Sequence, residues 1–160
     1  MNIAPILNVT PVRIPMTTLP PALQKAYVKS IRMGNVDVLN GTLHLESKPS
    51  APLDVVIGMN SGALDGQVVT GPQGSVADVS VVLMPDVRRR TELYRTTTTD
   101  TSGRFHFDRV PPGDYKAFAW EEVQEGAWFD PEFMRANENR GLPVRIAEGR
   151  TENARIEVGP

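Results

Sequence analysis

The stretch that decides the fold runs from Thr96 to Trp120 and reads TTTTDTSGRFHFDRVPPGDYKAFAW. Its β-branched threonines suit a pleated strand, and Asp100–Gly103 has the residues of a tight turn. In residues 104–108 phenylalanines alternate with polar residues, which places both aromatic rings on one face of a strand. A Val-Pro-Pro-Gly run then interrupts backbone pairing before a third strand at residues 114–120. The stretch therefore predicts a hairpin, a turn and a further strand, with no side chain arranged for chemistry.

Short apolar runs on either side extend this β pattern along the chain. Hydrophobic residues make up 40 % of the 160 residues, and 14 prolines and 13 glycines lie between the apolar runs. This distribution is typical of an all-β sandwich rather than of a disordered chain. Further strands are predicted within residues 3–14 and at 26–33, 36–39, 41–46, 53–58, 64–70, 77–84, 92–99, 142–147 and 153–158. One short helix is predicted at residues 131–139, because Asp130 and Pro131 have the order of an N-cap and a first helical position.

The composition argues against several classes of function. The net charge of −2 gives no electrostatic basis for nucleic-acid binding. The chain has no cysteine, which removes disulfides and cysteine-based zinc sites. His44 and His106 lack further ligands at a metal-binding spacing, and no phosphate-binding or nucleophile motif is present. We therefore expect no catalytic residues, no cofactor and no bound metal, and the chain is predicted not to be an enzyme.

A weak internal repeat runs through the chain. Leu19-Pro-Pro, followed by a strand that starts at Tyr27, echoes Val110-Pro-Pro, followed by a strand that includes Tyr115. Each copy then leads to a strand pair, and the second pair is predicted to be joined by a turn at Glu148–Gly149. The extra length of the second copy falls in a loop, where insertions are tolerated.

The repeat divides the chain into two unequal parts. Residues 1–59 are predicted to be the second half of a β-sandwich unit, and residues 60–160 a complete unit of normal sandwich size. A half-sandwich has open strand edges and an uncovered apolar face. Three completions are open: an upstream segment of a longer protein, the sheets of the complete domain, or another copy of the chain.

The complete unit resembles a known family of domains. The matching segments are Gly66-Gln-Val-Val, Ala77-Asp-Val-Ser-Val-Val-Leu83, Thr99-Asp-Thr-Ser-Gly-Arg-Phe-His-Phe107 and Val110-Pro-Pro-Gly-Asp-Tyr115. In these segments the chain resembles the carboxypeptidase regulatory-like domain, which is of the transthyretin (prealbumin) type. The resemblance implies a Greek-key β-sandwich of about seven strands, preceded here by the back half of a similar unit. It also implies a non-catalytic module of an exported or cell-surface bacterial protein, and some relatives have a carbohydrate-binding-like fold.

Large aromatic side chains supply the candidate contact surface. If Tyr115 points inward, as the resemblance implies, then Phe118 and Trp120 point to the outer face of their sheet. Such a patch needs a cover or a partner. Trp128, Phe129 and the predicted helix either fold back over the patch or join it as a contact surface for a sugar ring, a neighbouring domain or another subunit.

These observations lead to two hypotheses about function. The first is a structural or interaction module that assembles by strand complementation, with neighbouring domains or copies of the same chain as partners. The second is carbohydrate binding through the exposed aromatics, with polysaccharide as the partner. The first residues lack the segments of a signal peptide and no apolar run approaches the roughly 20 residues that span a bilayer. The chain is therefore cytosolic, a mature product or an internal fragment, and the resemblance favours an extracytoplasmic location, in the periplasm, at the cell surface or secreted.

Overall fold

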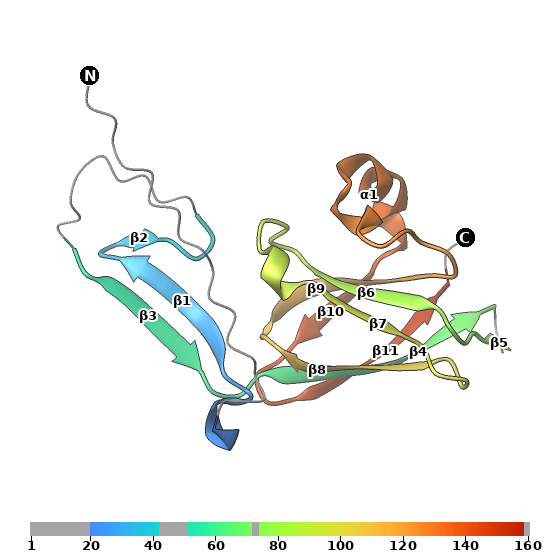
Figure 1. The fold of residues 1–160 in the computed structure, drawn as a ribbon, viewed down its shortest axis with the longest axis horizontal. Helices are drawn as coiled ribbons and strands as arrows, with labels where there is room; N and C mark the ends of the chain where they lie inside the picture. The colour runs from blue at the N-terminus through green and yellow to red at the C-terminus, as the bar shows by residue number, and fades with distance from the viewer. Residues whose placement is uncertain (1–19, 42–50, 72–73, 159–160) are drawn as a thin grey trace.

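The structure is a computed structural model that describes residues 20–41, 51–71 and 74–158. The strands predicted within residues 3–14 and at 41–46, and also His44, lie outside the described residues. The described chain forms a small N-terminal sheet beside a larger β-sandwich (Figure 1). The N-terminal sheet ends at Gly58 and the first strand of the sandwich begins at Gly62.

The N-terminal sheet has three antiparallel strands in the order β2-β1-β3. Its elements are η2 (Pro21–Leu23, a 3₁₀ turn), β1 (Tyr27–Met33), β2 (Val36–Asp37) and β3 (Leu53–Gly58). Strands β1 and β2 form a hairpin, in which Gly34 takes a positive φ of 57° that glycine adopts without steric cost. Strand β3 pairs with the other edge of β1, and the register shifts between Val28 and Ser30.

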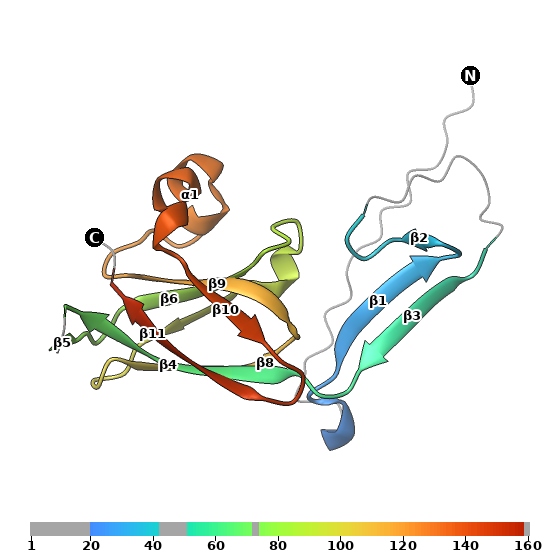
Figure 2. The same cartoon turned by 180° about the vertical axis from the view of Figure 1, so that it is seen from behind.

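The sandwich contains seven longer strands and the two-residue strand β5. Its strands are β4 (Gly62–Thr70), β5 (Gly74–Ser75), β6 (Ser80–Pro85), β7 (Arg95–Thr98), β8 (Arg104–Val110), β9 (Gly113–Trp120), β10 (Leu142–Ile146) and β11 (Thr151–Glu157). One sheet has the order β10-β9-β6-β7, and the other places β11 and β8 on β4, with β5 extending it. Figures 1 and 2 show the two sheets face to face. The predicted all-β sandwich is confirmed.

Helical segments lie between β9 and β10, where the sequence predicts one helix. They are η4 (Ala127–Phe129), α1 (Pro131–Asn137) and η5 (Glu138–Arg140). Elsewhere in the chain, a further 3₁₀ turn, η3 (Thr91–Leu93), precedes β7. The side chain of Asp130 caps α1 by accepting a hydrogen bond from the backbone N–H of Glu132 at 2.8 Å. The α-helix is shorter than predicted, because its last turn tightens into the 3₁₀ segment η5.

The core between the two sheets comes from the inward positions of the strands, from Val79 just before β6 and from Leu93 in η3. Its buried members are Leu64, Val68, Val79, Val81, Leu83, Leu93, Phe105, Phe107, Val110, Tyr115, Ala117, Ala119, Ile146 and Ile156. Burial of its phenol raises the pKa of Tyr115 to about 12, so this group stays protonated. The Tyr115 hydroxyl donates a hydrogen bond to the carbonyl of Pro111 at 2.8 Å, which satisfies the phenol at the end of the core.

The opening stretch forms three strands, but β7 and β8 are not a paired hairpin. Strand β7 pairs with β6 in one sheet, and β8 pairs with β4 in the other. Thr99 is buried at the corner: its Oγ1 donates to the carbonyl of Val76 at 2.9 Å and accepts from the N–H of Val79 at 3.0 Å. These bonds hold the end of β7 beside the segment that enters β6. The expectation of a hairpin was wrong because the turn crosses between sheets.

The last two strands also lie in different sheets, against the prediction of a strand pair. Strand β10 is antiparallel to β9, whereas β11 is parallel to β4. Gly149 has a positive φ of 67° at the crossing, and its N–H donates to the carbonyl of Asn60 at 3.0 Å. This crossing brings the C-terminal strand onto the first strand of the sandwich.

Candidate interaction surfaces

Strand β9 supplies side chains to both faces of its sheet. Tyr115, Ala117 and Ala119 belong to the core between the two sheets. Phe118 and Trp120 point to the opposite face, where Phe118 lies across from Val82 on β6. Their rings stack with centroids 5.2 Å apart and an interplanar angle of 3°. The outer face of this sheet is therefore strongly apolar and aromatic.

The segment between β9 and β10 folds back over this outer face. Trp128 from η4 and Met134 from α1 form a second buried cluster with Val82, Met84, Phe118 and Trp120. The indole Nε1 of Trp120 donates to the Asn137 side chain at 3.3 Å, so the polar atom of the ring is also satisfied. Figure 1 shows α1 on the far side of this sheet from β8 and β11, which makes the helical segment a third layer.

This cover corrects the view of the four aromatic residues as a candidate contact surface. Phe118 is 1 % exposed and Trp120 is 2 % exposed, and Trp128 is also buried. Phe129 is 52 % exposed and rests against the ring of Tyr94. Of the candidate residues, only Phe129 is available to a ligand or partner, because the helical segment seals the other three rings. The physical reason is that so large an apolar patch is unfavourable in water, and the chain itself covers it.

Charged side chains fasten the helical cover to the sheet. The carboxylate of Glu138 in η5 accepts hydrogen bonds from Arg88 Nη2 at 3.1 and 3.2 Å and from Lys116 Nζ. The hydrogen bond from Lys116, together with the charge of Arg88, holds the pKa of Glu138 below its ordinary value. The spacing of these three residues in the sequence gave no signal for the cluster, because Arg88 lies 50 positions before Glu138.

A shallow polar groove of about 880 Å³ lies on the sheet formed by β8, β4 and β11. His106 Nδ1 lies 2.5 Å from Asp65 Oδ1, and Gln67 Nε2 donates to the carbonyl of Ser102 at 3.1 Å. His106 is solvent-facing, as the strand alternation predicted. Within residues 20–41, 51–71 and 74–158, no group of three His, Cys, Asp or Glu side chains could hold a metal ion. Asp65 and His106 thus pair with each other, while Gln67 bonds to the backbone.

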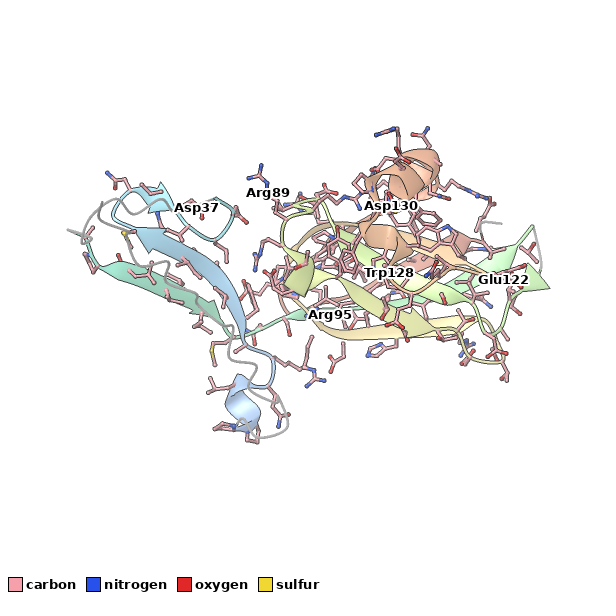
Figure 3. The ribbon with its side chains drawn as sticks, turned by 45° about the horizontal axis from the view of Figure 1, so that its top comes forward. Asp37, Arg89, Arg95, Glu122, Trp128 and Asp130 are labelled. Atoms are coloured by element: carbon pink, nitrogen blue, oxygen red, sulfur yellow. The ribbon has the colours of Figure 1, made fainter. Side chains whose placement is uncertain are left out.

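A second groove, of about 610 Å³, lies between the N-terminal sheet and the sandwich. One wall is apolar and is formed by Val28, Ile31 and Leu39. The opposite wall carries the charged side chains Arg90, Glu92, Arg95, Asp108 and Arg109. Figure 3 shows Arg89 and Arg95 at the end of the sandwich that faces the N-terminal sheet, on which Asp37 lies. The apolar side of this sheet thus faces a charged wall across open space, rather than a second apolar layer.

Exposed apolar side chains concentrate on strand β3. Leu53, Val55, Val56 and Ile57 are each between 46 and 52 % exposed, on both faces of the strand. Within the described residues β3 pairs only with β1, so its other edge is free of a neighbouring strand. The sequence predicts an open half-sandwich in this part of the chain. A signal was available, since the run Leu-Asp-Val-Val-Ile has one charge and neither proline nor lysine.

Comparison with known proteins identifies one matching family. The family described as the NOMO third transthyretin-like domain matches residues 39–137. The match begins before β3 and ends at the last residue of α1, so it includes part of the N-terminal sheet and most of the sandwich. No curated protein sequence matches the chain.

Several solved structures have a similar arrangement of strands. A DUF3823 family protein from Parabacteroides merdae is 17 % identical, with a TM-score of 0.45 over 63 % of this chain and 47 % of that protein. The major pilin subunit BcpA of Bacillus cereus is 16 % identical, with a TM-score of 0.42 over 66 % of this chain and 31 % of BcpA. A minor pilin of Streptococcus agalactiae is 20 % identical, with a TM-score of 0.40 over 68 % and 52 % of the two chains. The chain spans about half or less of each of these proteins, and likeness at this level carries no functional argument.

Proposed function

This chain belongs to the family of the NOMO third transthyretin-like domain, and from that premise we propose that it is a non-catalytic structural or interaction module. Its sandwich is the rigid part, and its N-terminal sheet is the surface that meets a neighbouring domain or another copy of the chain. Residues 1–59 then act as the half-unit that a partner completes, and residues 60–160 as the complete unit. The proposed location is outside the cytoplasm, as part of an exported or cell-surface protein.

The observation that carries this proposal is the exposure of β3. Val55, Val56 and Ile57 are consecutive in this strand and are each about half exposed. Apolar β-branched residues of this kind usually pack against a neighbouring layer. Soluble proteins normally protect such an edge with lysine, proline or a covering segment. Association with a partner would remove these apolar side chains from water, and would satisfy the backbone groups on the free edge.

Two described groups with shifted pKa values, Tyr115 and Glu138, have structural roles, which is consistent with the proposed non-catalytic role. The buried tyrosine, Tyr115, is held protonated inside the core, and the groove on the sheet of β8, β4 and β11 lies open to solvent. A catalytic acid or base is usually recessed and has a perturbed pKa. The pKa of Glu138 is lowered by its hydrogen bond from Lys116 and by the charge of Arg88, and this carboxylate fastens the helical cover. No helix in the described part of the chain has both the length and the apolar character to cross a bilayer.

Sedimentation of the full chain over a range of concentrations tests the proposal. We expect a concentration-dependent rise in mass, because the apolar edge is buried only when two chains meet. Replacing Ile57 with lysine should lower the association, and the same change at Val87, which is an exposed loop position in the sandwich, should not. A monomer at all concentrations, with the amides of residues 53–58 protected from exchange, would overturn self-association as the role of this sheet.

Carbohydrate binding through aromatic side chains is the alternative. It now rests on Phe129 alone among the four candidate residues, since Phe118, Trp120 and Trp128 are sealed beneath the helical cover. One exposed ring offers little stacking area for a sugar. A polysaccharide titration followed by tryptophan fluorescence tests this alternative, because Trp128 lies next to Phe129 with ring centroids 6.2 Å apart. A saturable change that is lost in Phe129→Ala would favour carbohydrate binding over the interaction role.

A further inference from the structure

The free edge of β3 has a defined set of unpaired backbone groups. The carbonyl of Ile31 on β1 accepts a hydrogen bond from the N–H of Val38 at 2.9 Å, on the side of β1 that carries β2. In an antiparallel strand, the N–H and C=O of one residue point to the same side. Ile31 therefore directs both groups away from β3. Its neighbour in the register, Val55, must direct its own N–H and C=O away from β1, toward the free edge.

The same alternation extends to the residues two positions away. Leu53 and Ile57 also direct their N–H and C=O groups to the free edge, and their side chains share one face with Val55. The edge thus presents three N–H donors and three C=O acceptors along an apolar ridge. Within the described chain no other strand takes up these groups. Such an edge is a template for one more antiparallel strand.

We propose that the occupant of this edge is strand β3 of a second copy of the chain, in an antiparallel pair centred on Val55. This inference rests on the proposed function and names the partner, the edge and the register of the association. Two antiparallel copies of one strand are related by a two-fold axis perpendicular to the sheet, so one residue must lie opposite its own copy. In the proposed register Val55 lies opposite Val55 of the second copy, and Leu53 lies opposite Ile57.

Charge and hydrogen bonding select this register over its neighbours. Pairing centred on Asp54 would place two carboxylates directly opposite each other, which is destabilising. Pairing centred on Val56 would leave the outward groups of Leu53 opposite Met59, which lies beyond the end of the strand. The register centred on Val55 engages all three outward residues of each copy. On one face it also forms a continuous row of cross-strand contacts between Leu53, Val55 and Ile57 side chains.

The pairing produces a closed dimer rather than a fibre. The joined sheet has the strand order β2-β1-β3 followed by β3-β1-β2 of the second copy, so both copies use the same edge. Within the described residues, the strand left at each outer end is β2, which has only the two residues Val36 and Asp37. So short an edge offers little template for further addition. An isologous contact of this kind satisfies both copies at once and does not propagate.

Single cysteine variants of the full chain test the register, since the natural sequence contains no cysteine. Opposite residues of a hydrogen-bonded antiparallel pair have Cα atoms about 5.5 Å apart, which a disulfide can bridge. We expect Val55→Cys to form a covalent dimer under mild oxidation at least tenfold faster than Val56→Cys, because residue 56 lies opposite residue 54 of the second copy and not opposite its own copy. Val55→Lys should weaken dimerisation at least tenfold, because it places like charges on the two-fold axis, whereas Val36→Lys on β2 should leave it unchanged.

The outcomes separate this inference from the proposed function. A dimer by sedimentation with fast linking through position 55 supports the inference. Faster linking through position 56, or a dimer that neither cysteine variant links, overturns the register while self-association stands. Growth to a series of larger species overturns the closed dimer and leaves the interaction role intact. A monomer at all concentrations overturns this inference together with self-association as the role of the N-terminal sheet.

Discussion

The outer face of the β9 sheet and the N-terminal sheet both present apolar side chains. The first is covered by another segment of the chain, whereas the second is exposed in the described residues. The outer face carries Phe118 and Trp120, and the segment between β9 and β10 seals it with Trp128 and Met134. The N-terminal sheet carries β3, whose apolar side chains are about half exposed, and the described part of the chain supplies no second layer for it. The comparison separates an apolar surface that belongs to the folded core from one that is open to a partner.

The covered face should account for the largest loss of stability on mutation. Trp120→Ala removes a buried ring that stacks on Phe118 and contacts Phe133 with centroids 5.5 Å apart. We expect the free energy of unfolding to fall by about 3–5 kcal/mol, because the helical cover cannot fill the cavity. Chemical denaturation followed by circular dichroism measures the change. Phe129→Ala is the control, and an equal loss for both variants would mean that the face is not sealed.

A single methyl group should distort the same cover. A Cβ atom at Gly141 would lie 2.5 Å from the Phe118 ring, while Gly113 has no closer neighbour than 3.5 Å. Both glycines have backbone conformations open to alanine, so only the available space differs. We expect Gly141→Ala to cost about 1–3 kcal/mol of stability through overpacking, and Gly113→Ala to be close to neutral. Thermal unfolding of the two variants makes the comparison, and a neutral Gly141→Ala would show that the cover is loosely packed.

A valine-to-alanine substitution on the covered face and on β3 compares the two surfaces directly. Val82 is fully buried beneath the helical cover, and Val55 is about half exposed on β3. We expect Val82→Ala to cost about 1.5 kcal/mol, close to the value of two buried methylene-sized groups, and Val55→Ala to change monomer stability by less than about 0.5 kcal/mol. Denaturation at low protein concentration measures both. Similar losses at the two positions would place β3 inside a packed core.

The charged fastening of the cover should have the smallest effect and a dependence on pH. Glu138 has a pKa below its ordinary value of 4.5, so its ionised form is favoured in the folded state. Its contribution is complete above that ordinary value and is lost as the pH falls through the lower folded-state pKa. We expect Glu138→Gln to cost about 0.5–1 kcal/mol at pH 7, because the ion pairs are partly exposed, and the difference should shrink at acid pH. Stability measured at pH 7 and pH 3 tests this, and a difference that does not depend on pH would exclude the carboxylate as its source.

Strand positions and the sandwich could be predicted from the sequence, because alternation and turn residues act locally. The strands at residues 26–33, 53–58 and 104–108 and the N-cap at Asp130 illustrate this, since each depends on neighbours within a few positions. Strand pairing could not be predicted as well. The crossings at Thr99 and at Gly149 depend on hydrogen bonds to Val76, Val79 and Asn60, which lie 20 or more positions away. Turn residues predict where the chain turns, but they do not predict which sheet the next strand joins.

For the candidate contact surface too, the sequence predicted the local geometry but not the long-range packing. The alternation of β9 correctly separated Tyr115 from Phe118 and Trp120, because two faces of a strand follow from its geometry. Whether the outer aromatics stay open depends on where the segment between β9 and β10 folds, and the sequence left both alternatives standing. The open surface on β3 had a signal in its single charge and its lack of proline and lysine, but its exposure depends on which strands pair with it.

Amide hydrogen exchange of β3 at several protein concentrations tests the central claim most directly. The N–H groups of Leu53, Val55 and Ile57 face the free edge, whereas those of Val81 and Leu83 lie in the core of the sandwich. We expect exchange at the three β3 amides to slow by at least tenfold as the protein is concentrated, with no change in β6. Slow exchange at these amides in a dilute monomer would contradict the account, because it would mean that the chain covers this edge by itself.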